Sequence, residues 1–112
     1  MADVQDLLVK RRQWKASVTR HCNTLERHLA ERNKEAVRTK LEALKKSFLS
    51  FEQAHEAYHA LLEEEDQVEE SDKFFLDHET FYTGIVGKAM EFLERSEEVK
   101  ELKEQVSVMN QY

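Results

Sequence analysis

Residues 37–62 read VRTKLEALKKSFLSFEQAHEAYHALL, and the spacing of their apolar side chains predicts the architecture of the chain. The repeating positions, separated by alternating steps of four and three, are Val37, Leu41, Leu44, Phe48, Phe51, His55, Tyr58 and Leu62. Residues at these steps share one face of an α-helix. Because the pattern holds for nearly four heptads, it indicates a long helix whose apolar seam packs against other helices.

Similar series lie on both sides of this stretch. The series before it consists of Val4, Leu7, Leu8, Trp14, Val18, Cys22, Leu25 and Leu29. The series after it consists of Phe75, His78, Tyr82, Ile85, Ala89, Phe92, Ser96 and Val99, continued by Leu102 and Val106 and widened by Phe74, Phe81 and Leu93. Arg11 falls inside the first series, where we expect its stem to lie along the seam and its guanidinium to reach water or a carboxylate.

Polar residues predict where these helices begin and end. Asn33 is a suitable N-cap for the second helix, and Ser71 or Asp72 can cap the third. The acidic run EEEDQVEESD, residues 63–72, interrupts the apolar series between them. We therefore expect helices at about residues 3–31, 34–67 and 72–108. The sequence leaves open whether the second and third helices separate at residues 69–72 or run on with a bend.

Length and composition favour one helical domain. The chain has 112 residues, no proline and two glycines, so we expect a single domain over residues 1–112. Short connections force sequential helices to run antiparallel. The predicted fold class is all-α, an elongated antiparallel three-helix bundle with coiled-coil-like seams. The alternative is a long helical hairpin whose third helix pairs with another chain.

The charge is distributed unevenly. Residues 1–50 carry 12 basic and 6 acidic residues, and residues 51–112 carry 5 and 17. A basic half can contact nucleic acid or an anionic membrane, but we favour mutual neutralisation of the two halves. No apolar run approaches a membrane span, the N-terminus lacks the apolar region of a signal peptide, and Cys22 is the only cysteine. We expect an intracellular, cytoplasmic protein.

The stretch HEAYH, His55 to His59, matches the H-E-x-x-H pattern of zinc proteases. Both histidines lie on or about 50° beside the apolar seam, and Glu79 stands where one class of these enzymes has its third ligand. The metal candidates are therefore His55, His59 and Glu79. We favour two seam histidines without metal, cofactor or catalytic residues, because nothing else indicates a substrate cleft. A buried, neutral His55 predicts that protonation near pH 5 to 6 loosens the bundle.

Two short motifs suggest contact surfaces. Gly84 and Gly87 in GIVGK point away from the seam and either weaken the third helix or, together with Leu76, Thr80 and Thr83, form an assembly face. In KRRQWK, Trp14 is in phase with the core. The flanking cations, which are candidates for contact with nucleic acid or another anionic partner, are Lys10, Arg12 and Lys15.

Three segments resemble the N-terminal Gag-like helical region of BEL/Pao-type LTR retrotransposon polyproteins. They are KRRQWKASVTRHCNTLE, KLEALKKSFLSFEQAHEAY and EEEDQVEESDKFFLDHETFYTGIVGKAMEFL, and the resemblance covers about residues 5–95. It implies a non-enzymatic module that self-associates to build particles that package RNA. It also implies that zinc knuckles, protease and polymerase lie elsewhere in the polyprotein.

The expected function is therefore a Gag-like assembly domain whose partner is a second copy of itself. The alternative is a host coiled-coil adaptor or scaffold that binds partner helices. A small zinc hydrolase using His55 and Glu56 is the third hypothesis.

Overall fold

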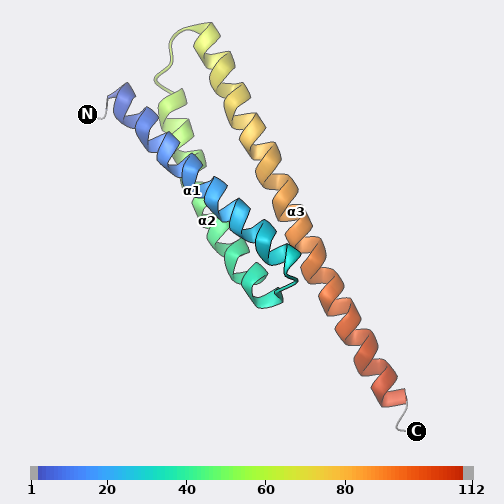
Figure 1. Cartoon of the computed structure of the whole chain (residues 1–112). Helices are drawn as coiled ribbons and strands as arrows, with labels where there is room; N and C mark the ends of the chain where they lie inside the picture. Colours follow the sequence, from blue (N-terminus) through green and yellow to red (C-terminus); the bar gives the residue numbers. More distant parts are fainter. Residues whose placement is uncertain (1–2, 110–112) are drawn as a thin grey trace.

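The computed structural model describes the backbone of residues 3–109 and the side chains of residues 3–95. It contains α1 (Val4–Ala30), α2 (Lys34–His59) and α3 (Glu65–Met109), and the described residues form no strand. The three helices run up, down and up in a molecule of 72 × 21 × 21 Å (Figure 1). α1 and α2 form a hairpin, and α3 lies against it and continues past the α1–α2 turn. The predicted all-α, elongated three-helix bundle is confirmed.

Local capping explains how the hairpin is formed. The Asp3 carboxylate accepts a hydrogen bond from the Gln5 amide at 2.6 Å, and Asn33 accepts one from Ala36 at 3.2 Å. Between the helices, Arg32 adopts a left-handed conformation with φ of 56°. The next amide, Asn33 N–H, donates to the His28 carbonyl at 3.1 Å, which closes the end of α1. The predicted cap at Asn33 is confirmed.

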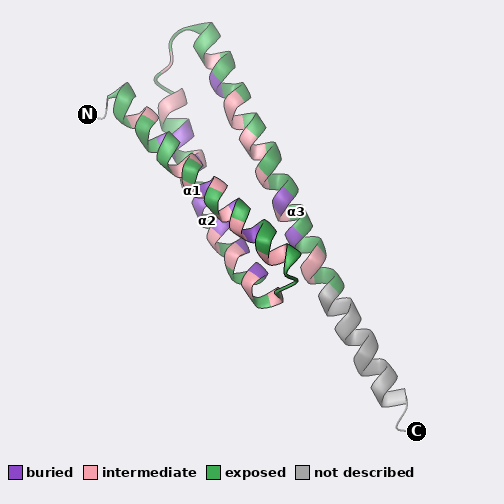
Figure 2. Ribbon diagram, viewed as in Figure 1, coloured by how far each residue is buried: buried purple, intermediate pink, exposed green. Residues whose placement is uncertain are grey.

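The core lies where the three predicted seams meet (Figure 2). Its buried apolar residues are Val18, Cys22, Leu25, Val37, Leu41, Leu44, Phe48, Phe51, Ile85 and Ala89. Phe48 of α2 stacks on Tyr82 of α3, with ring centroids 3.8 Å apart, and Phe51 stacks on Phe75 at 5.8 Å. Burial raises the pKa of Cys22 to about 11, so its thiol is a packed core group. The positions at Ser96, Val99, Leu102 and Val106 lie outside the residues whose side chains are described.

The boundary between the second and third helices was predicted wrongly. α2 ends at His59 rather than near residue 67, and α3 begins at Glu65 rather than near residue 72. Residues 60–64 connect them, so Leu62 falls outside the helical seam. Most of the acidic run belongs to the start of α3, where Glu65 and Asp66 are favoured by the helix dipole. Ser71 is not a cap but a buried residue inside α3.

The glycines of α3 allow a direct test of this architecture. Both lie inside the helix, and a Cβ built at either one meets nothing within 4 Å. We therefore expect Gly84→Ala and Gly87→Ala each to raise the free energy of unfolding by about 1 kcal/mol, measured by urea denaturation. Ala89→Gly, at a fully buried site of the same helix, should lower it. Destabilisation by either glycine substitution would mean that its face of α3 is covered in the monomer.

Candidate functional site

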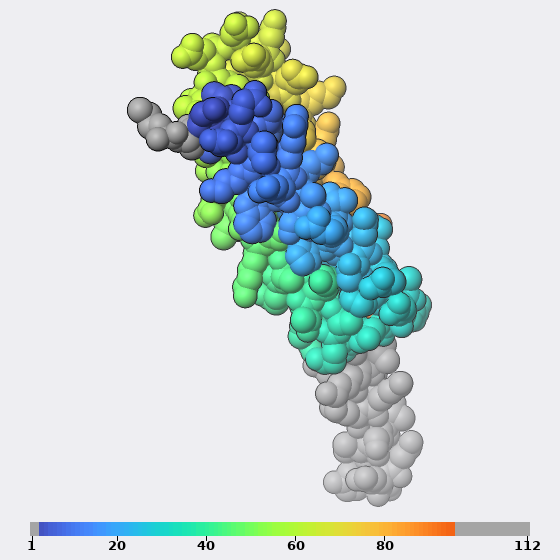
Figure 3. All heavy atoms as spheres, turned by 60° about the vertical axis from the view of Figure 1, so that its left-hand side comes forward, coloured from blue at the N-terminus to red at the C-terminus, as the bar shows by residue number. Residues whose placement is uncertain are grey.

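A polar cluster occupies the end of the bundle near the α2–α3 connection. The space-filling view places the first turns of α1 at this same end (Figure 3). One residue from each helix is more than nine-tenths buried here: Arg11 at 8% exposure, His55 at 5% and Ser71 at 4%. Each is in phase with the apolar stripe of its helix, and this phase directs the side chain inward. Three polar groups thus replace a layer of the apolar core.

The Arg11 guanidinium is held between two aromatic rings. Its Cζ lies 4.2 Å from the ring centroid of Tyr58 and 4.1 Å from that of Phe74. The sequence predicted that this group would reach water or a carboxylate; instead it stacks on two rings, although Arg11 also lines a surface pocket of about 310 Å³. No carboxylate among the described residues pairs with Arg11, and its Nε has no hydrogen-bond partner there. Attraction to the faces of the rings offsets part of the cost of burying the charge.

Hydrogen bonds from Arg11 determine the state of His55. Arg11 Nη1 donates to Ser71 Oγ and to His55 Nδ1, both at 3.2 Å. A guanidinium can only donate, so His55 Nδ1 carries no proton and the imidazole is neutral. Burial, reinforced by the charges of Arg11 and His59, lowers the pKa of His55 to about 4. The ring also stacks on Phe75, with centroids 4.6 Å apart.

His59 links the cluster to the surface. Its Nδ1 lies 3.0 Å from Ser71 Oγ, and its Nε2 lies 3.5 Å from Asp72 Oδ1. Ser71 can accept from Arg11 while donating its own proton to His59. The two histidines also line a cleft of about 320 Å³ with Glu52, Glu56, Ala60, Asp72 and Phe75. The cluster is therefore one connected network from buried Arg11 to exposed Asp72.

The structure does not bring the three metal candidates together. Asp72 is beside His59, but Glu79 follows it by seven residues, about 10 Å further along the α3 axis. His55 Nδ1 faces a cation, and both nitrogens of His59 face polar groups of α3. Within the described part of the chain, no group of three His, Cys, Asp or Glu residues has the arrangement to hold a metal ion. The network fits a neutral structural pair better than a zinc site.

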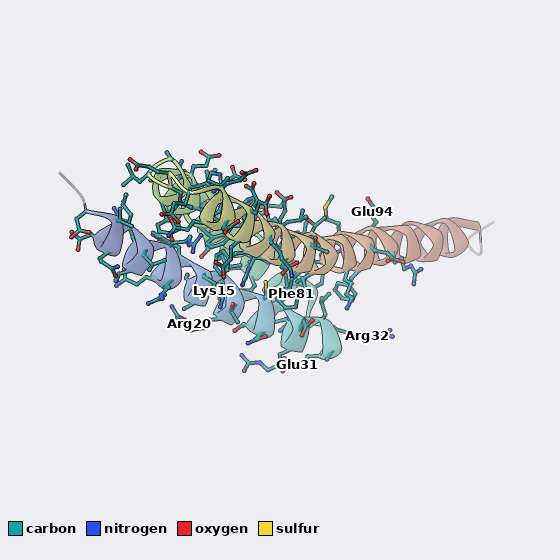
Figure 4. All side chains as sticks on the ribbon, turned by 90° about the horizontal axis from the view of Figure 1, so that it is seen from above. Lys15, Arg20, Glu31, Arg32, Phe81 and Glu94 are labelled. Carbon is teal, nitrogen blue, oxygen red and sulfur yellow. The ribbon has the colours of Figure 1, made fainter. Side chains whose placement is uncertain are left out.

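The basic candidates of α1 do not form one patch. Lys10 and Arg12 are exposed but lie about 160° apart around the helix. Lys15 points between α1 and α3, with its Nζ 5.8 Å from the ring centroid of Phe74 (Figure 4). Sequence reasoning missed a different basic cleft, because it joins the α1–α2 turn to α3. This cleft of about 590 Å³ is lined by Leu29, Arg32, Lys34, Lys88, Glu91, Phe92 and Arg95.

The five residues of the expected assembly face, Leu76, Thr80, Thr83, Gly84 and Gly87, are all exposed. Leu76 is 59% exposed, and Leu49 of α2 is exposed to a similar extent, at 54%. Over the described residues, no helix is long and apolar enough to cross a membrane. Comparisons with models of protein families, with curated proteins and with solved structures give no match to this chain.

Acidification should weaken the bundle through His55. Its pKa is about 4 in the folded state and about 6.5 in the unfolded state, so the unfolded chain binds the proton more readily. The free energy of unfolding should therefore fall from pH 6.5 towards pH 4, by up to about 3 kcal/mol from this group. His55→Gln, which keeps an acceptor for Arg11 without titrating, should remove that part of the slope. Equal pH slopes in the two proteins would contradict a neutral, buried His55.

Removal of the Arg11 side chain should have two effects. Arg11→Ala leaves the space between Tyr58 and Phe74 empty and should cost about 2–4 kcal/mol of unfolding free energy. It also removes a cation 3.2 Å from His55 Nδ1, so the pKa of His55 should rise. The imidazole signals in NMR spectra recorded against pH measure this rise. Arg12→Ala, at the exposed neighbouring position, is the control and should change neither quantity appreciably.

Proposed function

We propose that this chain is a non-enzymatic, Gag-like assembly domain that binds a second copy of itself through the assembly face of α3. The single observation that carries the proposal is the exposure of this face: Leu76, two threonines and two glycines cover no part of the bundle. An apolar side chain beside small residues lets another helix approach closely. The resemblance of the three sequence segments to BEL/Pao-type Gag regions supports the same role.

The polar cluster supports the non-enzymatic part of this proposal. Arg11 and His55 are buried, and Arg11 Nη1 bonds to His55 Nδ1, so these two atoms are engaged inside the bundle. Catalysis by acid–base or metal chemistry needs groups that reach a reacting atom. The most strongly shifted histidine, at a pKa of about 4, is instead explained by its place beside a buried cation. The cluster then serves to fix how the helices pack.

An adaptor that binds partner helices is the second form of an interaction module. It would use the same exposed face of α3, but its occupant would be another protein. An intracellular, cytoplasmic location belongs to both proposals and is supported by the lone, buried Cys22, which has no second cysteine in the chain to pair with. RNA packaging is expected only of the Gag-like role.

Sedimentation velocity at several concentrations, with and without RNA, tests the assembly function. We expect the wild-type chain to form larger species as its concentration rises, and RNA to promote them further. Gly87→Trp should reduce self-association without changing helicity, because a Cβ built at this position meets nothing within 4 Å and the position opens to solvent in the monomer. Ala57→Trp, at an exposed position of α2, is the matched control and should associate normally. A chain that stays monomeric at every concentration, with RNA present, would refute self-assembly and favour the adaptor.

A further inference from the structure

Four charged residues lie on the assembly face or along one edge of it: Lys73, Asp77, Lys88 and Glu91. All four are exposed, and Lys73, Asp77 and Lys88 form no ion pair with other described residues. Lys73 and Glu91 are 18 residues apart, which is about five helical turns, so they share one angular position on α3. Asp77 and Lys88 lie along the neighbouring line, within about 20° of each other. Each of these two rows of residues along α3 therefore has a positive charge at one end and a negative charge at the other.

These charges are complementary to a second copy in one orientation. Lys73 and Glu91 have their midpoint at about residue 82, as do Asp77 and Lys88. When two α3 helices pair antiparallel about that midpoint, each lysine meets a carboxylate of the other copy. A parallel, in-register pair would instead place each charge at the same height as its own like, which is destabilising. The charge pattern thus selects the antiparallel arrangement.

The uncharged residues of the assembly face fit the same register. Thr80 and Gly84 also have their midpoint at residue 82, so these small residues meet where the helix axes cross. Leu76 then lies opposite Gly87 of the second copy, on the same edge of the contact. Leu76 is 59% exposed in the monomer, and the space above Gly87 is open. Packing one over the other would bury apolar surface that the monomer leaves in water.

Other charges of α3 do not change this preference. Glu91 bonds to Arg95 of its own helix at 2.6 Å, but both side chains are largely exposed, so the carboxylate can also reach a lysine of the second copy. Further out, Glu70 would lie near Arg95 of the second copy, and Glu69 near its Glu94. The first of these outer contacts is attractive and the second is repulsive, so their effects on the pair are opposite. Figure 4 shows Glu94 pointing away from α1, towards the side left free by the hairpin.

We propose that two copies of this chain pair through antiparallel α3 helices, centred at residue 82, with Lys73 against Glu91, Asp77 against Lys88 and Leu76 over Gly87. This inference rests on the proposed self-association and adds the orientation, the register and the residues that determine them. The contact is isologous, because the same face of α3 is used on both sides of a two-fold axis. It leaves the polar cluster outside the pair but includes Lys88 and Glu91, which also line the basic cleft at the α1–α2 turn.

Charge reversal tests the register. Lys73→Glu places two carboxylates together at two symmetry-related sites and should weaken dimerisation at low salt about tenfold or more. Glu91→Lys should do the same, and the double variant Lys73→Glu/Glu91→Lys should return close to the wild-type dissociation constant. Arg20→Glu, the same charge change at an exposed site of α1, is the control and should leave dimerisation unchanged. Sedimentation equilibrium gives the constants, and circular dichroism checks that every variant is folded.

A distance measurement tests the orientation. A spin label on Glu69→Cys should lie about 40 Å from its mate in the antiparallel pair, and about 10 Å away in a parallel one. Cys22 is buried and does not compete for the label. This pairing is overturned if neither single charge variant changes the dissociation constant of the dimer, or if the label gives the short distance. Self-association would then still stand. A wild-type chain that stays monomeric overturns both.

Discussion

The burial of the Arg11 guanidinium is the constraint on which the arrangement of α3 depends. α1 and α2 are joined by a tight, capped turn, but α3 is attached through a connection of five residues and needs contacts to fix its position. Arg11 supplies them by stacking on Phe74 and bonding to Ser71, while Tyr58 and His55 hold it from α2. One side chain thus joins all three helices. Together with the stacking of Phe48 on Tyr82 and of Phe51 on Phe75, its geometry sets the rotation of α3 and therefore which residues face solvent.

Burying a cation without a carboxylate partner costs free energy, because the charge loses its hydration. Two aromatic faces and two neutral acceptors compensate for lost hydration, and this works only while His55 stays unprotonated. Apolar residues in place of Arg11, His55 and Ser71 would pack more easily, but they would also permit α3 to slide or rotate. Buried polar groups in helical bundles are known to select one register at some cost in stability. The network from Arg11 to Asp72 is suited to that role, and it couples the register to pH.

Periodicity predicted the helices and the core, but not the chemistry inside the core. The seam of α2 and the cap at Asn33 follow from local spacing and hydrogen bonding, which a sequence shows directly. Arg11 and Ser71 form contacts 60 residues apart in the chain, so no local pattern places them together. Arginine generally prefers water and serine prefers helix ends, and these preferences led to predictions for Arg11 and Ser71 that differ from the structure.

The end of α2 was misplaced for a related reason, since Leu62 extends the apolar spacing beyond the point where the helix stops. The five residues of the assembly face were predicted to point away from the seam, and all five are exposed, because angles within one helix need no tertiary information.

The glycines of α3 connect stability to function. Glycine inside a helix costs about 1 kcal/mol relative to alanine, and Gly84 and Gly87 have neither a positive φ nor a close neighbour to compensate for it. Nothing within the described part of the monomer therefore uses their lack of a side chain. The antiparallel pairing of α3 does use it, since Gly84 lies at the crossing point and Gly87 beneath Leu76 of the other copy. Because Arg11 and Ser71 determine which side of α3 faces outward, the buried network and the proposed contact are two consequences of one helix rotation. A change that lets α3 rotate, including protonation of His55, would turn the glycines away from the second copy as well as loosening the bundle.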